Sequence, residues 1–139
     1  MARHCTTFDH TADVGLAATA DTLGELLEAL AMGVVEVVCD PRQVRPVRKR
    51  PVAVQAEDVE ALAVDFLSAV LWAVQTDRFL VASVDVTAVS DNAVEAELSG
   101  EQYDPARHEL KTEVKAVTYH QLQVARAAEG WTGRVILDL

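Results

Sequence analysis

The chain has 139 residues, half of them apolar, and a formal net charge of −10. This length and apolar content predict a single folded domain over residues 1–139 with a hydrophobic core, and they exclude a disordered chain. A chain this acidic lacks the broad phosphate-neutralising surface that holds nucleic acid directly. It contains no run of about 18 apolar residues and no signal-peptide core at its start, so we expect a cytoplasmic protein with no membrane segment.

The first elements expected are two short strands, at residues 3–8 and 14–20, on either side of a polar turn at 9–13. Cys5 lies in the first strand, and Cys39 is the only other cysteine. Neither belongs to a Cys-x-x-Cys pair, so we expect no disulfide framework and no structural zinc site. We interpret both cysteines as small apolar fillers.

A long amphipathic helix should follow these strands. Its apolar residues recur at helical spacing from Leu23 to Val37. Thr22 and Glu25 have the spacing of a capping box at its start. Because Pro41 disfavours helical geometry at the residue before it, the helix should end one or two residues before this proline.

A basic stretch punctuated by prolines comes next and leads into an expected strand at residues 52–55. Five of the twelve basic residues fall within nine positions: Arg42, Arg45, Arg48, Lys49 and Arg50. We interpret the stretch as a solvated connector. The alternative is a docking loop for an acidic or RNA-bearing partner.

A second helix is the clearest element of the chain. Its apolar residues form one continuous stripe from Val59 to Val74. Glu57 and Asp58 place negative charge at its start, where the helix dipole favours it. Trp72 lies off the stripe, and it either packs against a loop or marks a contact surface.

The apolar period then changes from helical to alternating. Apolar residues alternate with polar ones at 84–88 and 94–98, and the residues at 90–92 suit a turn, which predicts an antiparallel hairpin. A polar loop at 103–108 should leave His108 exposed. Strands are expected at 114–125 and 131–139. Two helices and many short strands, not in strict alternation, predict an α+β fold: one domain with a mixed or largely antiparallel sheet.

Acidic residues stand at both ends of the chain, with Asp13 early and Asp138 one residue before the end. Two carboxylates about 4 Å apart repel by roughly 4 kcal/mol at an effective dielectric constant of 20. If the fold brings the ends together, the oxygen donors suit a hard divalent cation such as calcium or magnesium. The alternative is that Asp9 and Asp13 satisfy amides of a turn, and that Asp138 is a solvated terminal residue.

Two further polar residues stand out. Lys115 lies in an expected strand, where lysine is disfavoured. It either faces solvent or directs its ammonium towards the carboxylates or a partner's phosphate group. His10 is a candidate ligand, proton carrier or turn residue. The chain has no helical His-x-x-x-His pair, so a zinc enzyme is poorly supported.

Several enzyme classes lack their motifs in this chain. It has no nucleotide-binding Gly-x-x-x-x-Gly-Lys-Ser/Thr loop and no Gly-x-Ser-x-Gly elbow of a serine hydrolase. Only seven aromatic residues are present, so an aromatic-rich RNA-binding strand is absent as well. The residues themselves therefore indicate an acidic α+β domain with a candidate cation site.

Four blocks in order resemble the archease family: Asp9-His10-Thr11-Ala12-Asp13-Val14-Gly15, Gly100-Glu101-Gln102-Tyr103-Asp104-Pro105-Ala106-Arg107-His108, Glu113-Val114-Lys115-Ala116-Val117-Thr118-Tyr119-His120 and Val135-Ile136-Leu137-Asp138-Leu139. This resemblance implies an archease-like fold. It also implies an accessory protein, not itself an enzyme, that activates a GTP-dependent RNA-splicing ligase. Such a protein promotes guanylylation of the ligase histidine and repeated turnover in tRNA splicing or RNA repair. It meets RNA only through the ligase.

The resemblance also implies which residues act. A metal site carries to Asp13, Asp138 and Leu139, the last through a main-chain oxygen. Lys115 matches a lysine important for activation, and Asp9 and His10 match the first block with less defined roles. Two alternatives from other classes are a stand-alone metal-dependent hydrolase and a general protein chaperone.

Overall fold

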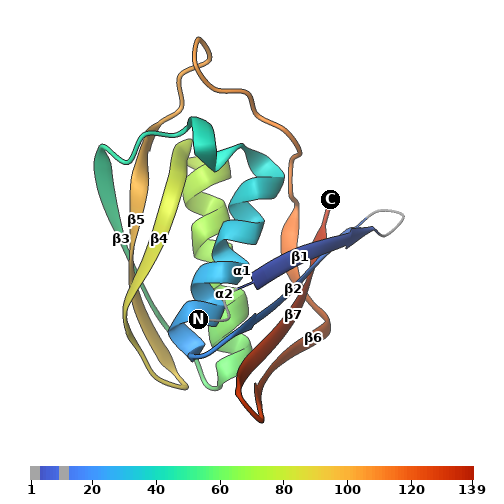
Figure 1. Ribbon diagram of the computed structural model, residues 1–139. Coiled ribbons are helices and arrows are strands. Elements are labelled where there is room, and N and C mark those ends of the chain that lie inside the picture. Colours follow the sequence, from blue (N-terminus) through green and yellow to red (C-terminus); the bar gives the residue numbers. More distant parts are fainter. Residues whose placement is uncertain (1–3, 10–12) are drawn as a thin grey trace.

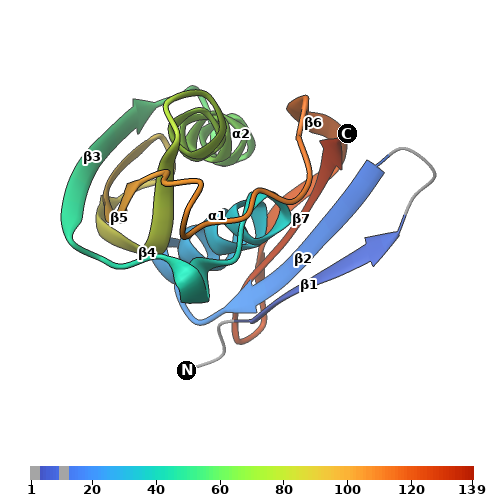
Figure 2. The ribbon, with the colours of Figure 1, turned by 90° about the horizontal axis from the view of Figure 1, so that it is seen from above.

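The structure is a computed structural model that describes residues 4–9 and 13–139. Two helices, α1 (Leu23–Val38) and α2 (Val59–Leu71), lie between two sheets (Figures 1 and 2). Within the described residues the strands are β1 (His4–Asp9), β2 (Asp13–Ala20), β3 (Arg48–Gln55), β4 (Phe79–Val89), β5 (Ala93–Gln102), β6 (Ala116–Ala127) and β7 (Gly130–Asp138).

The sheets are ordered β1-β2-β7-β6 and β3-β5-β4, and each neighbouring pair is antiparallel. Each sheet turns one face towards the helices, and the buried apolar residues form one core between the two layers. The predicted α+β fold with two main helices and a largely antiparallel arrangement is confirmed. The sequence did not reveal that the strands divide into two sheets.

Helix α1 begins and ends where its capping residues predict. The Thr22 hydroxyl accepts a hydrogen bond from the Glu25 amide at 3.2 Å and donates one to the Glu25 carboxylate at 3.0 Å. The last helical residue is Val38, followed by Cys39 as C-cap. Gly33 lies where the helix crosses the first sheet. A Cβ there would come within 2.8 Å of Cys5 Sγ, so close packing requires this glycine.

Helix α2 is the core helix of the molecule. It begins after Asp58, whose side chain accepts a hydrogen bond from the Ala61 amide at 2.8 Å, and it continues as a π-helical turn (Trp72–Thr76). By length and composition, Val59–Thr76 is the one described helix apolar enough to cross a membrane. Apolar side chains of this helix, such as Phe66, are fully buried between the sheets. This burial is typical of the core helix of a folded domain. The indole of Trp72 is 60% exposed.

The basic stretch is not a connector throughout, and that prediction is wrong for its second half. Strand β3 begins at Arg48 and continues through Pro51. Strand β3 is an edge strand of its sheet, a position that tolerates proline. The first half of the stretch is a short 3-10 turn (Pro41–Gln43) that leads to Arg45.

The last two strands differ from their predicted bounds. Strand β6 begins at Ala116, so Lys115 lies just before it and not inside it. The β6–β7 register shifts between Thr118 and Gln123, and Gln121 within this bulge has a positive φ of 52°. The regular alternation of faces expected along a strand is therefore interrupted at this bulge.

Candidate functional site

The two acidic chain ends meet at one end of the first sheet. Asp13 opens β2 and Asp138 closes β7, and the two residues are direct partners in the antiparallel register. Side chains opposite each other in such a pair point to the same face, with Cβ atoms about 5 Å apart. In Figure 2 the start of β2, the start of β6 and the C-terminus lie together.

Lys115 joins these residues through its main chain. Its amide donates a hydrogen bond to the Asp138 carbonyl at 2.7 Å, and the following residue, Ala116, is the register partner of Asp138. The Lys115 side chain is exposed, and Asp13 and Asp138 are partly exposed. We refer to Asp13, Lys115, Asp138 and Leu139 as the tip.

The carboxylates of the tip lie on the outer face of the sheet. Leu16 faces α1, because a Cβ on Gly33 would come within 3.2 Å of its methyl groups. Asp13 is three positions from Leu16, so strand alternation turns it to the opposite face. The carboxylates of Asp13 and Asp138 are therefore directed away from the hydrophobic core, whereas Leu139 packs against it.

The remaining predicted residues of the first block are only partly described. The Asp9 backbone pairs with Val14, one position from Asp13. His10 lies outside the described residues. Leu139 follows β7 and is half-buried.

The tip fits a hard cation better than a soft one. Within residues 4–9 and 13–139, no three His, Cys, Asp or Glu side chains gather in a way that could hold a metal ion, so a closed protein ligand set such as that of structural zinc is absent there. Two facing carboxylates with a main-chain oxygen beside them suit calcium or magnesium, which complete their coordination with water. Burial raises the pKa of the Cys5 and Cys39 thiols to about 11, which keeps both in the protonated form that ligates metals poorly.

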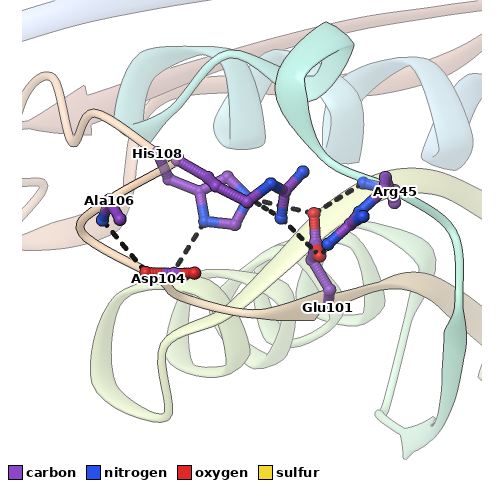
Figure 3. A network of polar contacts seen from close by, with 6 residues as sticks. Arg45, Glu101, Asp104, Ala106 and His108 are labelled. Atoms are coloured by element: carbon purple, nitrogen blue, oxygen red, sulfur yellow. Dashed lines mark hydrogen bonds and ion pairs between the residues drawn. The ribbon is translucent and has the colours of Figure 1, made fainter.

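A second polar cluster lies in the second block of the sequence, and Figure 3 shows it from close by. Glu101, only 6% exposed, is at its centre. Its carboxylate accepts hydrogen bonds from the Arg45 amide at 2.8 Å and from Arg107 Nη1 at 2.8 Å. His108 Nε2 lies 2.9 Å from the same carboxylate. We refer to Arg45, Glu101, Arg107 and His108 as the Glu101 network.

His108 is buried, so the prediction that it is exposed is wrong. Its Nδ1 accepts a hydrogen bond from the Asp104 amide at 3.0 Å, which leaves the ring proton on Nε2, directed to Glu101. The Asp104 carboxylate in turn accepts from the Ala106 amide at 3.0 Å. The polar loop at 103–108 is therefore held against the protein by the hydrogen bonds of His108.

The donors around Glu101 change its acidity. The hydrogen bond from Arg107 contributes most, followed by those from the Arg45 amide and from His108, and together they lower the pKa of Glu101 from 4.5 to about 2. Glu101 therefore stays ionised at neutral pH. No buried side-chain nitrogen or oxygen among the described residues lacks a hydrogen-bond partner, so we interpret this network as a structural connection between the 103–108 turn and the sheet.

One residue near the tip is missed by the sequence patterns. Gln75, in the π-helical turn after α2, is hydrogen-bonded to the residue before Lys115. A single glutamine at a helix end carries no motif. The only signal is that the regular apolar stripe stops there.

Comparisons with known proteins identify the family and the fold. The model of the archease protein family matches residues 6–139. The protein archease of Methanosarcina acetivorans is 35% identical over 135 residues, which cover 94% of this chain and 92% of the relative. That of Thermococcus gammatolerans is 36% identical over 136 residues, with coverage of 95% and 96%.

Two solved structures share the fold over nearly the whole chain. The solution structure of protein 1598 from Methanobacterium thermoautotrophicum has a TM-score of 0.80 and 31% identity, covering 97% of this chain and 98% of that one. The crystal structure of an archease from Thermotoga maritima, described as a possible chaperone, has a TM-score of 0.65. Its identity is 19% with 96% coverage of both chains, so it supports the fold alone.

Proposed function

Because the chain belongs to the archease protein family, we propose that it is an accessory protein that activates a GTP-dependent RNA-splicing ligase in the cytoplasm. It promotes guanylylation of the ligase's active-site histidine and allows repeated turnover in tRNA splicing or RNA repair. The protein is not itself the ligase. Its net charge of −10 is consistent with contact to RNA only through the ligase.

One observation carries the proposal. The antiparallel register sets Asp13 opposite Asp138, and the Lys115 amide is bonded to Asp138 at 2.7 Å. Three charged residues from three distant parts of the sequence thus lie at one end of one sheet. Family membership alone would not explain why the fold closes its ends there.

The residues that would hold a divalent cation are Asp13 and Asp138 through their carboxylates and Leu139 through a main-chain oxygen. When bound, calcium or magnesium supplies positive charge that neutralises phosphate oxygens. The main-chain oxygen of Asp138 already accepts from Lys115, so it orders the lysine rather than the metal.

The protein's own contribution is positional and electrostatic. Guanylylation develops negative charge on the phosphates of GTP, and a preorganised ammonium stabilises such charge. Lys115 supplies that ammonium on a main chain fixed by hydrogen bonds. The Lys115 side chain is exposed and Asp13 and Asp138 are partly exposed, so these charged groups can meet the nucleotide site of a partner without unfolding any strand.

The alternatives have less support. A stand-alone metal-dependent hydrolase needs a substrate pocket beside its metal. The depression lined by Glu36, Asp40 and Lys111, for example, includes no residue of the tip. A general chaperone needs a large exposed apolar patch. The large apolar side chains exposed in the described part of the chain are divided among separate segments: Val47, Trp72, Val89 and Tyr119.

The test mixes the purified protein with the ligase of the same organism, GTP and a divalent metal. Covalent GMP labelling of the ligase and RNA joining over several turnovers are followed with and without the protein. We expect both to accelerate, and we expect folded Asp13→Ala and Lys115→Ala variants to retain only a small, measurable part of the acceleration. Full acceleration by both variants would reject the tip as the active surface. Phosphate or acyl ester hydrolysis without the ligase would favour the hydrolase, and suppressed aggregation of unrelated proteins would favour the chaperone.

A further inference from the structure

The side chain of Gln75 is hydrogen-bonded to the main chain of Val114, the residue before Lys115, as a neighbouring strand would be. Its Nε2 donates to the Val114 carbonyl at 2.6 Å, and its Oε1 accepts from the Val114 amide at 2.8 Å. Val114 is fully buried and lies before β6 begins. A buried main-chain amide and carbonyl outside a strand need such partners, because leaving them unpaired is costly.

The helix turn that carries Gln75 is itself unusual. After Leu71 the α-helix widens into a π turn, closed by a hydrogen bond from the Asp77 amide to the Trp72 carbonyl at 3.0 Å. A wider turn changes the direction of the side chains that follow, and π turns are frequent at functional sites. Here the half-buried Gln75 reaches the segment between β5 and β6.

The segment before Lys115 has few other means of support. Residues 111–115 form no helix or strand. Their main chain is bonded at Lys111 and Thr112 to the end of α1, at 2.7 and 3.1 Å. Its far end is bonded by the Lys115 amide to Asp138. Gln75 is the side chain that fixes the residue between these two anchor points.

From this arrangement we infer that Gln75 is a positioning residue for Lys115: it sets where the lysine stands relative to Asp13 and Asp138. The inference rests on the proposed function, since it assigns Gln75 a part in ligase activation. The hydrogen bonds of the Gln75 side chain are made to the main chain of Val114 and not to the charged groups of the tip. It acts through the main chain of Val114.

The activity test uses Gln75→Met, which keeps side-chain length and helix propensity but removes both hydrogen bonds. The rate of ligase guanylylation is measured over a range of concentrations of the variant. We expect the maximal stimulated rate to fall about tenfold, while the half-saturating concentration changes less than about twofold. The matched control is Gln55→Met, because Gln55 is exposed in β3, at the edge of the sheet that does not carry the tip. The control should keep the wild-type rate.

A double variant separates positioning from general loosening. If Gln75 acts through Lys115, then Gln75→Met combined with Lys115→Ala should be no slower than Lys115→Ala alone. Additive losses, or a raised half-saturating concentration with an unchanged maximal rate, would overturn the inference.

Amide hydrogen exchange tests the same inference without the ligase. In Gln75→Met the amide hydrogens of Val114 and Lys115 should exchange at least about tenfold faster than in the wild type. The amide hydrogen of Val135 in β7 should exchange at the wild-type rate. Unchanged exchange at both amides would overturn the positioning role. A wild-type protein that stimulates no ligase would instead reject the proposed function, and the exchange data would still decide what Gln75 orders.

Discussion

The tip and the Glu101 network both gather charged residues from distant parts of the chain, but by different means. The tip is ordered by the main chain, through the β2–β7 register and the bond from Lys115 to Asp138. The Glu101 network is ordered by side chains around a carboxylate that is 6% exposed. Charged groups of the tip can therefore be replaced without removing the bonds that hold its strands, whereas Glu101 cannot. Activity and stability should separate between the two regions.

The largest effect is expected at the tip. Asp138→Ala removes a carboxylate but keeps the main-chain carbonyl that accepts from Lys115. We expect maximal ligase stimulation to fall about 100-fold, because a carboxylate that would hold the phosphate-neutralising cation is lost, while the melting temperature changes by less than about 3 °C. Guanylylation kinetics and thermal unfolding measure the two. Asp91→Ala, in the exposed β4–β5 turn, is the matched control. Undiminished stimulation by Asp138→Ala would contradict the role of the tip in ligase stimulation.

The opposite behaviour is expected in the Glu101 network. Glu101→Gln keeps the shape of the side chain but leaves the Arg45 and Arg107 guanidiniums without their carboxylate. We expect the melting temperature to fall by on the order of 10 °C, with maximal stimulation retained at temperatures where the variant is folded. Glu95→Gln, exposed on the same strand, is the control. If Glu101→Gln has the melting temperature of the wild type but stimulates the ligase poorly, the Glu101 network has a functional and not a structural role.

The two regions also differ in how far the sequence predicted them. The helices, the β4–β5 hairpin and the capping of α1 by Thr22 follow local patterns, and the structure has them close to the predicted bounds. The meeting of Asp13 and Asp138 depends on the register of distant strands, which spacing alone does not fix. The order of the four blocks in the sequence favoured it.

The Glu101 network was missed because its signals are not local. Arg45 and Glu101 are 56 residues apart, and Arg45 appeared to belong to a solvated connector. In β5 the alternation of buried and exposed residues ends near a bulge, where the register shifts between Val81 and Ser83 of β4. Gly100 faces this bulge, and a Cβ there would lie 1.8 Å from the Leu80 carbonyl oxygen. Gly100 and Glu101 are both buried, a pattern that strand alternation does not predict.

A divalent cation should stabilise the tip and leave the Glu101 network unaffected. If calcium binds Asp13 and Asp138, its presence at 100 times the dissociation constant adds about 2.7 kcal/mol to the free energy of unfolding. The melting temperature should then rise by several degrees and return to its starting value with a chelator. Thermal unfolding with calcium, magnesium or chelator measures this effect. In Asp13→Asn the rise should be lost, whereas Glu101→Gln should keep it on top of its lower starting value. An equal rise in wild type and Asp13→Asn would place the cation elsewhere.

The smallest effect concerns pH and isolates Glu101 from the other carboxylates. Its pKa is lowered from 4.5 to about 2, chiefly by Arg107. Between these values the unfolded chain binds more protons at this position than the folded chain. The stability contributed by Glu101 is therefore complete above about pH 4.5 and is lost as the pH falls towards 2.

Urea unfolding of wild type and Glu101→Gln at pH 5.5 and pH 3.5 measures this contribution by difference. Asp40, whose pKa is lowered by its hydrogen bonds with Arg42, is present in both proteins, so its contribution cancels. We expect the difference in unfolding free energy between the two proteins to shrink at the lower pH. Its slope against pH should correspond to the uptake of at most about one proton on unfolding. A difference that stays constant would mean that the donors around Glu101 do not favour its charged form. The network would then stabilise the fold by shape alone, and its contrast with the tip would no longer be one of charge.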